Sequence, residues 1–247
     1  FNGQTLKDIN NWVENNTEGL IQKIIEKIEP DHLMFLINTV LFEAEWQKIY
    51  EESNIRDDIF NAGDGTKKTV KFMNSTEANY ISDASGATGF IKPYSGSKYS
   101  FATILPPENT DVYSYAASLN GSSFLALVGN TKQAKVNASM PKFSYECSYT
   151  LNDTLKTLGI KTAFSNADFS KLGTSPLGNI CISEVAHKAY IRVDEKGTKA
   201  GAATSVTVVP TSYDPNIYRV KLDRPFLYSI IDNLTNLPIF IGVCSSI

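Results

Sequence analysis

Imidazole and thiol groups carry much of the nucleophilic and metal chemistry of proteins, and this chain has few of them. Its histidines are His32 and His187, and its cysteines are Cys147, Cys181 and Cys244. The cysteines are widely separated, odd in number and without CxxC spacing, which argues against a zinc site or a redox motif. Two histidines leave little material for a Ser-His-Asp triad. We therefore expect buried, unreactive cysteines, no metal, no cofactor and no enzymatic activity.

The bulk composition is that of an ordinary globular protein. The 247 residues are 42% hydrophobic and 20% charged, with a formal net charge of -3. Without a basic run, nothing in the chain favours nucleic acid or an anionic membrane as a partner. No apolar run approaches the roughly 20 residues of a membrane helix. The first ten residues, FNGQTLKDIN, lack the basic and apolar regions of a signal peptide.

The N-terminal part of the chain contains two helical patterns and one long apolar run. Residues Thr5–Asn15 place Leu6, Ile9 and Val13 on one face, which predicts an amphipathic helix with Thr5 as its N-cap. LIQKIIEKI, residues 20–28, has helical spacing but is short and rich in Ile. The segment His32–Trp46 is apolar and β-branched, and predicts a buried central strand.

The remainder alternates between strands and short helices. Several short strands separated by turns are predicted between Ile55 and Pro107. We expect helices in residues 110–119, 122–128 and 151–159, a strand in residues 135–149, and a hairpin formed by residues 220–232 and 237–246. No linker divides the chain. The predicted class is α+β with large, mainly antiparallel sheets.

The segment Cys181–Val193 is predicted to be a strand with two unlike faces. One face carries Val185, His187, Ala189, Ile191 and Val193, and the other carries Glu184, Lys188 and Arg192. His187 would therefore point inward among apolar residues. A buried imidazole needs a hydrogen-bond partner, because leaving it unpaired is costly.

The next segment, DEKGTKAGAATSVTVVPTS, is too apolar for an ordinary loop and too small-sided for an ordinary core strand. One alternating set of its residues contains no charge and nothing larger than valine: Thr198, Ala200, Ala202, Thr204, Val206 and Val208. Two interpretations follow. The segment is either an exposed edge strand or flexible loop, or an element that can enter a crowded sheet with this slim face buried.

Five stretches of the chain resemble the serpin family, and specifically its inhibitory members. They are VDEKGTKAGAAT, VKLDRPFLYSI, INTVLFEAEW, AHKAYIRVDEKG and the long run MPKFSYECSYTLNDTLKTLGIKTAFSNADFSKL. They occur in the family's order, almost from end to end. The resemblance implies a single serpin domain over residues 1–247, with short helices and an exposed reactive-centre loop over residues 195–219. It also implies that residues 20–28 are irregular rather than helical.

The resemblance implies a metastable suicide inhibitor, secreted as most of the family are. A target serine protease would cleave the loop and become acyl-linked to it, and the cleaved loop would insert into the main sheet as a new strand. Counting sixteen positions from Glu195 places the cleaved bond at Thr211–Ser212, which suits an elastase-like or subtilisin-like protease. A register two residues later would make Tyr213 the bait for a chymotrypsin-like protease.

Other expected site residues follow from the same resemblance. The hinge that enters the sheet first comprises Glu195, Gly197, Thr198, Lys199, Ala200, Gly201, Ala202, Ala203 and Thr204. The shutter, at the centre of the sheet, is the pair Asn38 and His187. The breach, where the hinge enters, comprises Trp46, Lys142 and Glu195. The inward positions are odd before the hinge and even after it, so we expect a slip such as a bulge near Gly197.

The chain departs from the family pattern at its start, which corresponds to the stretch before the helix that crosses the main sheet. The family's N-terminal helical portion is therefore expected to be missing. Two alternatives to an inhibitor stay open: a non-inhibitory carrier, chaperone or storage protein, or an inactive remnant. A missing packing layer would expose apolar surface, so the expected partners include an N-terminal serpin segment or further copies of the chain.

Overall fold

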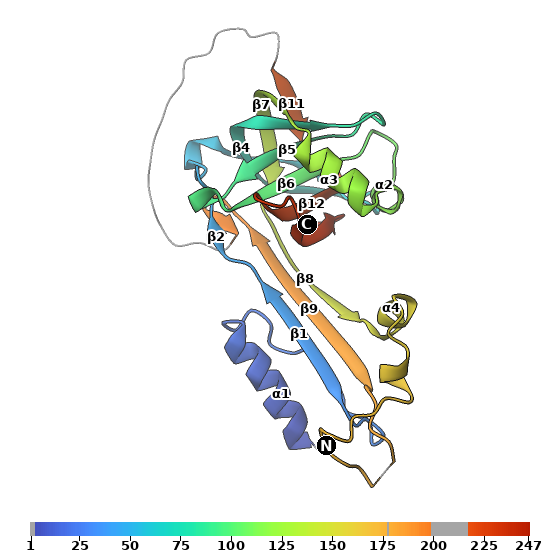
Figure 1. Cartoon of the computed structure of the whole chain (residues 1–247). Coiled ribbons are helices and arrows are strands. Elements are labelled where there is room, and N and C mark those ends of the chain that lie inside the picture. The colour runs from blue at the N-terminus through green and yellow to red at the C-terminus, as the bar shows by residue number, and fades with distance from the viewer. Residues whose placement is uncertain (1–2, 177, 199–216) are drawn as a thin grey trace. The chain divides into compact units, whose positions relative to one another are not determined.

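The computed structural model describes residues 3–176, 178–198 and 217–247 (Figure 1). The chain divides into two compact units. One comprises Phe1–Phe42 and Tyr145–Ile191, and the other comprises Glu43–Ser144 and Arg192–Ile247. Helices and two β-sheets run through the described residues, so the predicted α+β class is confirmed.

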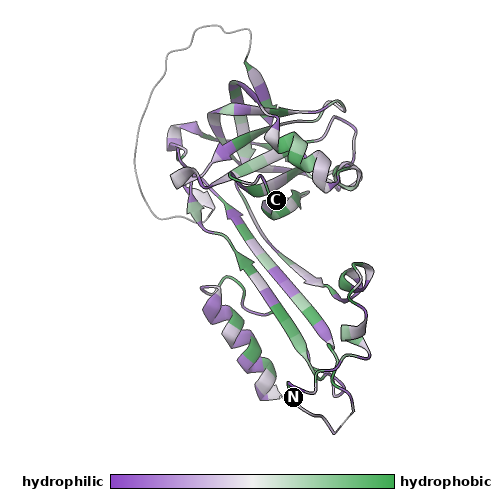
Figure 2. Cartoon of the chain, in the orientation of Figure 1, coloured by the Kyte–Doolittle hydropathy of each residue, from purple (hydrophilic) through white to green (hydrophobic). Residues whose placement is uncertain are grey.

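The first unit is built around two parallel strands. β1 (Phe35–Leu41) pairs with β9 (Glu184–Val193), and β8 (Phe143–Thr150) pairs with β9 as well. Figure 2 shows mostly hydrophobic residues along β1 and an alternation of polar and hydrophobic residues along β9. The short elements α4 (Asn152–Thr157) and η3 (Thr162–Phe164) follow β8.

An amphipathic helix, α1 (Gly3–Asn16), packs on these strands as the sequence predicts. Its Val13 is fully buried, in a cluster with Ile21, Ile24, Ile25 and Ala186. Since the helix begins at Gly3, the prediction that Thr5 is its N-cap was wrong. Residues 20–28 contain no helix, as the family resemblance implied and the local spacing did not.

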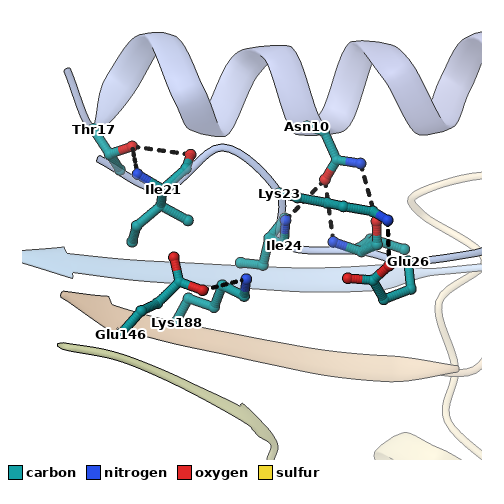
Figure 3. A network of polar contacts seen from close by, with 9 residues as sticks. Asn10, Thr17, Ile21, Lys23, Ile24, Glu26, Glu146 and Lys188 are labelled. Carbon is teal, nitrogen blue, oxygen red and sulfur yellow. Dashed lines mark hydrogen bonds and ion pairs between the residues drawn. The ribbon is translucent and has the colours of Figure 1, made fainter. Parts of the chain in front are cut away.

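Two side chains fasten this irregular segment to α1 (Figure 3). The Oδ1 of Asn10 accepts from the amides of Ile24 and Ile25, at 2.9 and 3.1 Å, and its Nδ2 donates to the Ile25 carbonyl at 3.0 Å. The hydroxyl of Thr17 accepts from the Ile21 amide at 3.1 Å. Because the segment lacks regular structure, these bonds pair backbone groups that would otherwise be buried without partners.

Burial in the first unit differs from the expectation in one respect. The segment His32–Trp46 was predicted to be one buried central strand, but it forms two strands, β1 and the short β2 (Ala44–Glu45). Leu36 is 43% exposed, and no residue of β1 is fully buried. The reason is that β1 has only β9 as a neighbour among the described strands. On β9 both faces are partly covered, because the adjacent residues Val185 and Ala186, which point to opposite faces, are both buried. Ala186 and Tyr190 lie on the face that packs beneath α1.

The second unit contains a sheet of eight strands in the order β11-β7-β4-β5-β6-β12-β13, with β3 paired to β4. All neighbours are antiparallel except β11 and β7. The bounds are β3 Ile55–Asn61, β4 Lys67–Ser82, β5 Thr88–Pro93, β6 Tyr99–Leu105, β7 Lys132–Pro141, β11 Tyr218–Lys221, β12 Phe226–Asp232 and β13 Pro238–Cys244. β12 and β13 form the predicted hairpin, whereas the strand predicted over residues 135–149 is broken at Lys142.

Helices α2 (Val112–Ser118) and α3 (Gly121–Gly129) lie where short helices were predicted. Both contribute to an apolar cluster with β4, β5, β6 and β12. Single turns of 3-10 helix form η1 (Glu52–Asn54) and η2 (Ser95–Ser97). The unit also contains a second, smaller ladder of β2 (Ala44–Glu45) and β10 (Gly197–Thr198), which forms part of the site below.

The thiols are all free, and they differ in burial. Cys244 is fully buried, which raises the pKa of its thiol to about 12. Cys147 and Cys181 are half-buried, so the expectation of three buried cysteines was wrong for these two. In the described ranges, His, Cys, Asp and Glu side chains do not gather in groups of three or more that could hold a metal ion. The helices described there are all too short or too polar to cross a membrane.

Candidate functional site

The chain reverses direction at the hinge. β9 ends at Val193, a turn follows, and Gly197 and Thr198 return as β10, antiparallel to β9. β10 lies between β9 and β2, with Thr198 opposite both Val193 and Ala44. The bulge expected near Gly197 was therefore wrong. A reversal with this register pairs odd positions of β9 with even positions after the turn, which accounts for the change of parity in the sequence.

The hinge turn is held by its three carbonyl groups. The indole Nε1 of Trp46 donates to the Asp194 carbonyl at 2.8 Å. The amide of Tyr50 donates to the Glu195 carbonyl at 2.9 Å, and the amide of Trp46 donates to the Lys196 carbonyl at 2.9 Å. Within the turn, the Asp194 carboxylate accepts from the Lys196 amide at 2.9 Å. Two residues, Trp46 and Tyr50, thus clamp the whole turn.

An aromatic pair lies against the first hinge residues. Trp46, predicted at the breach, is only 2% exposed and stacks on Tyr94 with ring centroids 4.6 Å apart. The hydroxyls of Tyr94 and Thr198 lie 2.6 Å apart, and Thr198 is 1% exposed. The hinge threonine therefore already occupies a buried, hydrogen-bonded place.

Gly197 has no room for a side chain. A Cβ atom built on it would overlap the carbonyl oxygen of Ala44 and lie 2.8 Å from the Cα of Glu45. Glycine is thus required here by the close approach of the β2 backbone.

Glu195 and Lys142 form the ion pair that was expected at the breach. Their charged atoms lie 2.6 Å apart, and each side chain is about one third exposed. The Lys142 ammonium group holds the pKa of the Glu195 carboxyl below its usual value. Lys142 is placed by the break between β7 and β8, where its amide donates to the Lys71 carbonyl at 2.8 Å.

The two residues predicted to form the shutter, Asn38 and His187, are directly paired in the parallel ladder of β1 and β9. Asn38 is exposed and His187 is half-buried, with its ring 6.5 Å from that of Tyr149. In the part of the chain that the structure describes, no hydrogen bond joins Asn38 to His187. The structure brings the two residues together but does not give the imidazole the expected partner.

The other predicted residues lie outside the described ranges. They are the hinge residues Lys199, Ala200, Gly201, Ala202, Ala203 and Thr204, the predicted cleavage site Thr211–Ser212, and the alternative Tyr213. Further along the sequence, the structure describes the chain again from Ile217, and β11 pairs in parallel with β7.

Sequence reasoning missed four residues of this site: Tyr50, Tyr94, Lys92 and Glu77. The Lys92 ammonium group lies 2.9 Å from the Glu77 carboxylate, with the two side chains only 3% and 8% exposed. A single lysine within the apolar run GFIKPY was the available signal. That signal does not reveal the partner, because Glu77 lies on a different strand.

The geometry of the hinge agrees with the protein family that the whole chain resembles. The family model for serpins, described as serine protease inhibitors, matches residues 1–247. The chain belongs to the serpin family. An uncharacterised serpin-like protein of Thermococcus kodakarensis is 33% identical over 243 residues, which cover 97% of this chain and 56% of that protein.

Solved serpin structures share the fold. The native state of the thermophilic serpin tengpin is 50% identical, with a TM-score of 0.92 over 100% of this chain and 64% of that one. A complex of thyroxine-binding globulin with thyroxine is 27% identical, with a TM-score of 0.82 over 98% of this chain and 64% of that one. This serpin chain thus spans less than two thirds of the length of these relatives.

Proposed function

We propose that this serpin inhibits a serine protease as a suicide substrate, by inserting its cleaved loop between β1 and β9. The observation that carries the proposal is the position of β10. Gly197 and Thr198 already form a short strand between β9 and β2, antiparallel to β9 as an inserted loop would be. The protease would supply the catalytic groups, and the serpin itself would catalyse nothing.

The register of the two ladders supports this proposal. Ala44 and Val193, the partners of Thr198, have the same sequence separation as Asn38 and His187, which pair directly. A strand that enters from the hinge would therefore part β1 and β9 without shifting one along the other.

Continuing the same register predicts the partners of each inserted residue. Thr204 would lie opposite both Asn38 and His187, and Thr207 would lie opposite Phe35 and Glu184. The inserted threonine hydroxyl would then be near the half-buried imidazole of His187. Ten or so new ladder hydrogen bonds at a net ~1 kcal/mol each would stabilise the inserted state by on the order of 10 kcal/mol.

We place the cleaved bond at Thr211–Ser212 and propose an elastase-like or subtilisin-like target. A threonine at the cleaved position is small and β-branched, which suits a shallow specificity pocket. Cleavage after Tyr213 by a chymotrypsin-like protease is the alternative, and the two are separated by sequencing the new N-terminus after cleavage.

The experiment is to mix the protein with an elastase and examine the products on a denaturing gel. An SDS-stable adduct of the two proteins is the expected result. Thr211→Arg is the matched variant, and it should transfer adduct formation from elastase to a trypsin-like protease. Cleavage without an adduct, for both pairings, would contradict the inhibitory function.

A second candidate is a non-inhibitory serpin. The observation in its favour is the likeness to thyroxine-binding globulin, which was solved in complex with thyroxine. In that case the loop would be cleaved cleanly, and cleavage would not raise the melting temperature.

A further inference from the structure

We propose that the buried pair of Lys92 and Glu77 positions the hinge, by holding in place the two residues that clamp the hinge turn. The inference rests on the proposed function in that the positioned element is the inserting loop. The pair lies within the second unit, on the neighbouring strands β5 and β4.

The first step is that Lys92 lies over both clamping residues. Its ammonium nitrogen is 4.2 Å from the ring centroid of Tyr50 and 5.5 Å from that of Trp46. Attraction between a cation and an aromatic face is strongest where water is excluded, and all three residues are at most 5% exposed.

The second step concerns the polar groups around the ring of Tyr50, which are its own hydroxyl, the Ser75 hydroxyl near it and the Lys92 ammonium group over its face. The Tyr50 hydroxyl is buried and has no hydrogen-bond partner in the described part of the chain. Since the Ser75 hydroxyl donates to the Glu77 carboxylate, the Lys92 cation over the face of the ring is the polar contact that orients it. The backbone amide of the same residue donates to the Glu195 carbonyl of the hinge turn.

The third step is that Glu77 fixes Lys92 in this place. Burial lowers the pKa of the Lys92 ammonium group, and the Glu77 carboxylate opposes that shift. The carboxylate is fixed in turn by the hydroxyl of Ser75, which donates to it at 2.6 Å. A buried ion pair is weak evidence for stability, so a positional role accounts better for its presence.

The position of the hinge can be measured without any protease. The amides of Trp46 and Tyr50 donate to the hinge turn, so their hydrogen exchange reports whether the turn is docked. Lys92→Met is the test variant. Lys71→Met is its matched control, because Lys71 lies on β4 and pairs with Asp57 at 2.9 Å, with both side chains more than half exposed.

We expect Lys92→Met to accelerate exchange of these two amides at least about tenfold relative to Lys71→Met. The double variant Lys92→Met/Glu77→Gln removes both charges and should recover the unfolding midpoint, since no buried charge is left unpaired. If the cation orients the rings, exchange in the double variant stays fast. Equal exchange in Lys92→Met and Lys71→Met, or normal exchange in the double variant, would overturn the proposal.

A second pair of variants decides the matter if Lys92→Met does not fold. Tyr50→Phe keeps the ring under the Lys92 cation and loses only the hydroxyl, so its exchange should match that of the unaltered protein. Tyr50→Leu removes the aromatic face and should show accelerated exchange at Trp46. Equal rates in these two variants would refute the role of the ring. Because the readout uses intact protein, a failure to form a protease adduct would leave this result unchanged.

Discussion

The hydroxyl groups of Tyr94 and Thr198 lie 2.6 Å apart in a buried place, where Tyr94 also stacks on Trp46. Thr198 is the last described residue before the segment that would insert, and its two ladder partners lie on β9 and β2. The entry point of the sheet is thus already filled by a small side chain whose hydroxyl is hydrogen-bonded. Insertion would extend this arrangement rather than create it.

Under the proposed function, replacing Thr198 with arginine should yield a protein that is cleaved as a substrate and does not trap the protease. A long charged side chain cannot be buried beside Tyr94 without losing its hydration, so the hinge would be expelled and insertion would slow. We expect cleavage by elastase at an unchanged rate, with loss of the SDS-stable adduct, measured on a denaturing gel. Lys196→Arg is the control, because Lys196 is exposed. This variant should still form the SDS-stable adduct with elastase. An intact adduct in Thr198→Arg would contradict the importance of this position.

Replacing Gly197 with alanine should destabilise the intact protein. The new methyl group would overlap the β2 backbone, and overpacking of this kind typically costs about 1–3 kcal/mol. The free energy of unfolding from urea titrations measures the effect. Gly121→Ala is the matched control, since a Cβ atom at Gly121 meets nothing within 4 Å. Equal stability of the two variants would show that β2 can move away from the hinge.

Local sequence patterns predicted the elements in which apolar residues recur at one regular spacing, that of a helix or that of a strand. The stripe of Leu6, Ile9 and Val13 predicted α1, and the two apolar runs near the C-terminus predicted the hairpin of β12 and β13. The hinge turn was predicted as a bulge, because alternation alone shows that parity changes but not whether the chain reverses. The pair of Lys92 and Glu77 was missed, because a charged residue is expected to be exposed unless its partner is known.

The contribution of the Glu195–Lys142 pair to stability should depend on pH. The pKa of Glu195 is lower in the folded protein than its usual value, so the folded state favours the ionised carboxylate. The stabilisation is therefore fully present above the ordinary glutamate pKa of ~4.3 and is lost as the pH falls through the lowered folded value. Urea titrations of the unaltered protein and of Glu195→Gln should differ at pH 6, and the difference should become smaller as the pH is lowered towards 3. A difference that stays constant over this range would count against the ion pair.

The exposed side of β1 should cause the chain to self-associate. β1 has the apolar sequence FLINTVL and has β9 as its neighbour among the described strands, and an apolar strand edge without a partner is a template for pairing. We expect sedimentation velocity to show oligomers whose fraction rises with concentration, and Leu36→Lys to lower that fraction because a charge on an edge strand opposes pairing. Leu158→Lys, at a 76% exposed leucine outside the strands, is the control and should leave the fraction unchanged. Equal effects of the two lysines would place the association elsewhere than on β1.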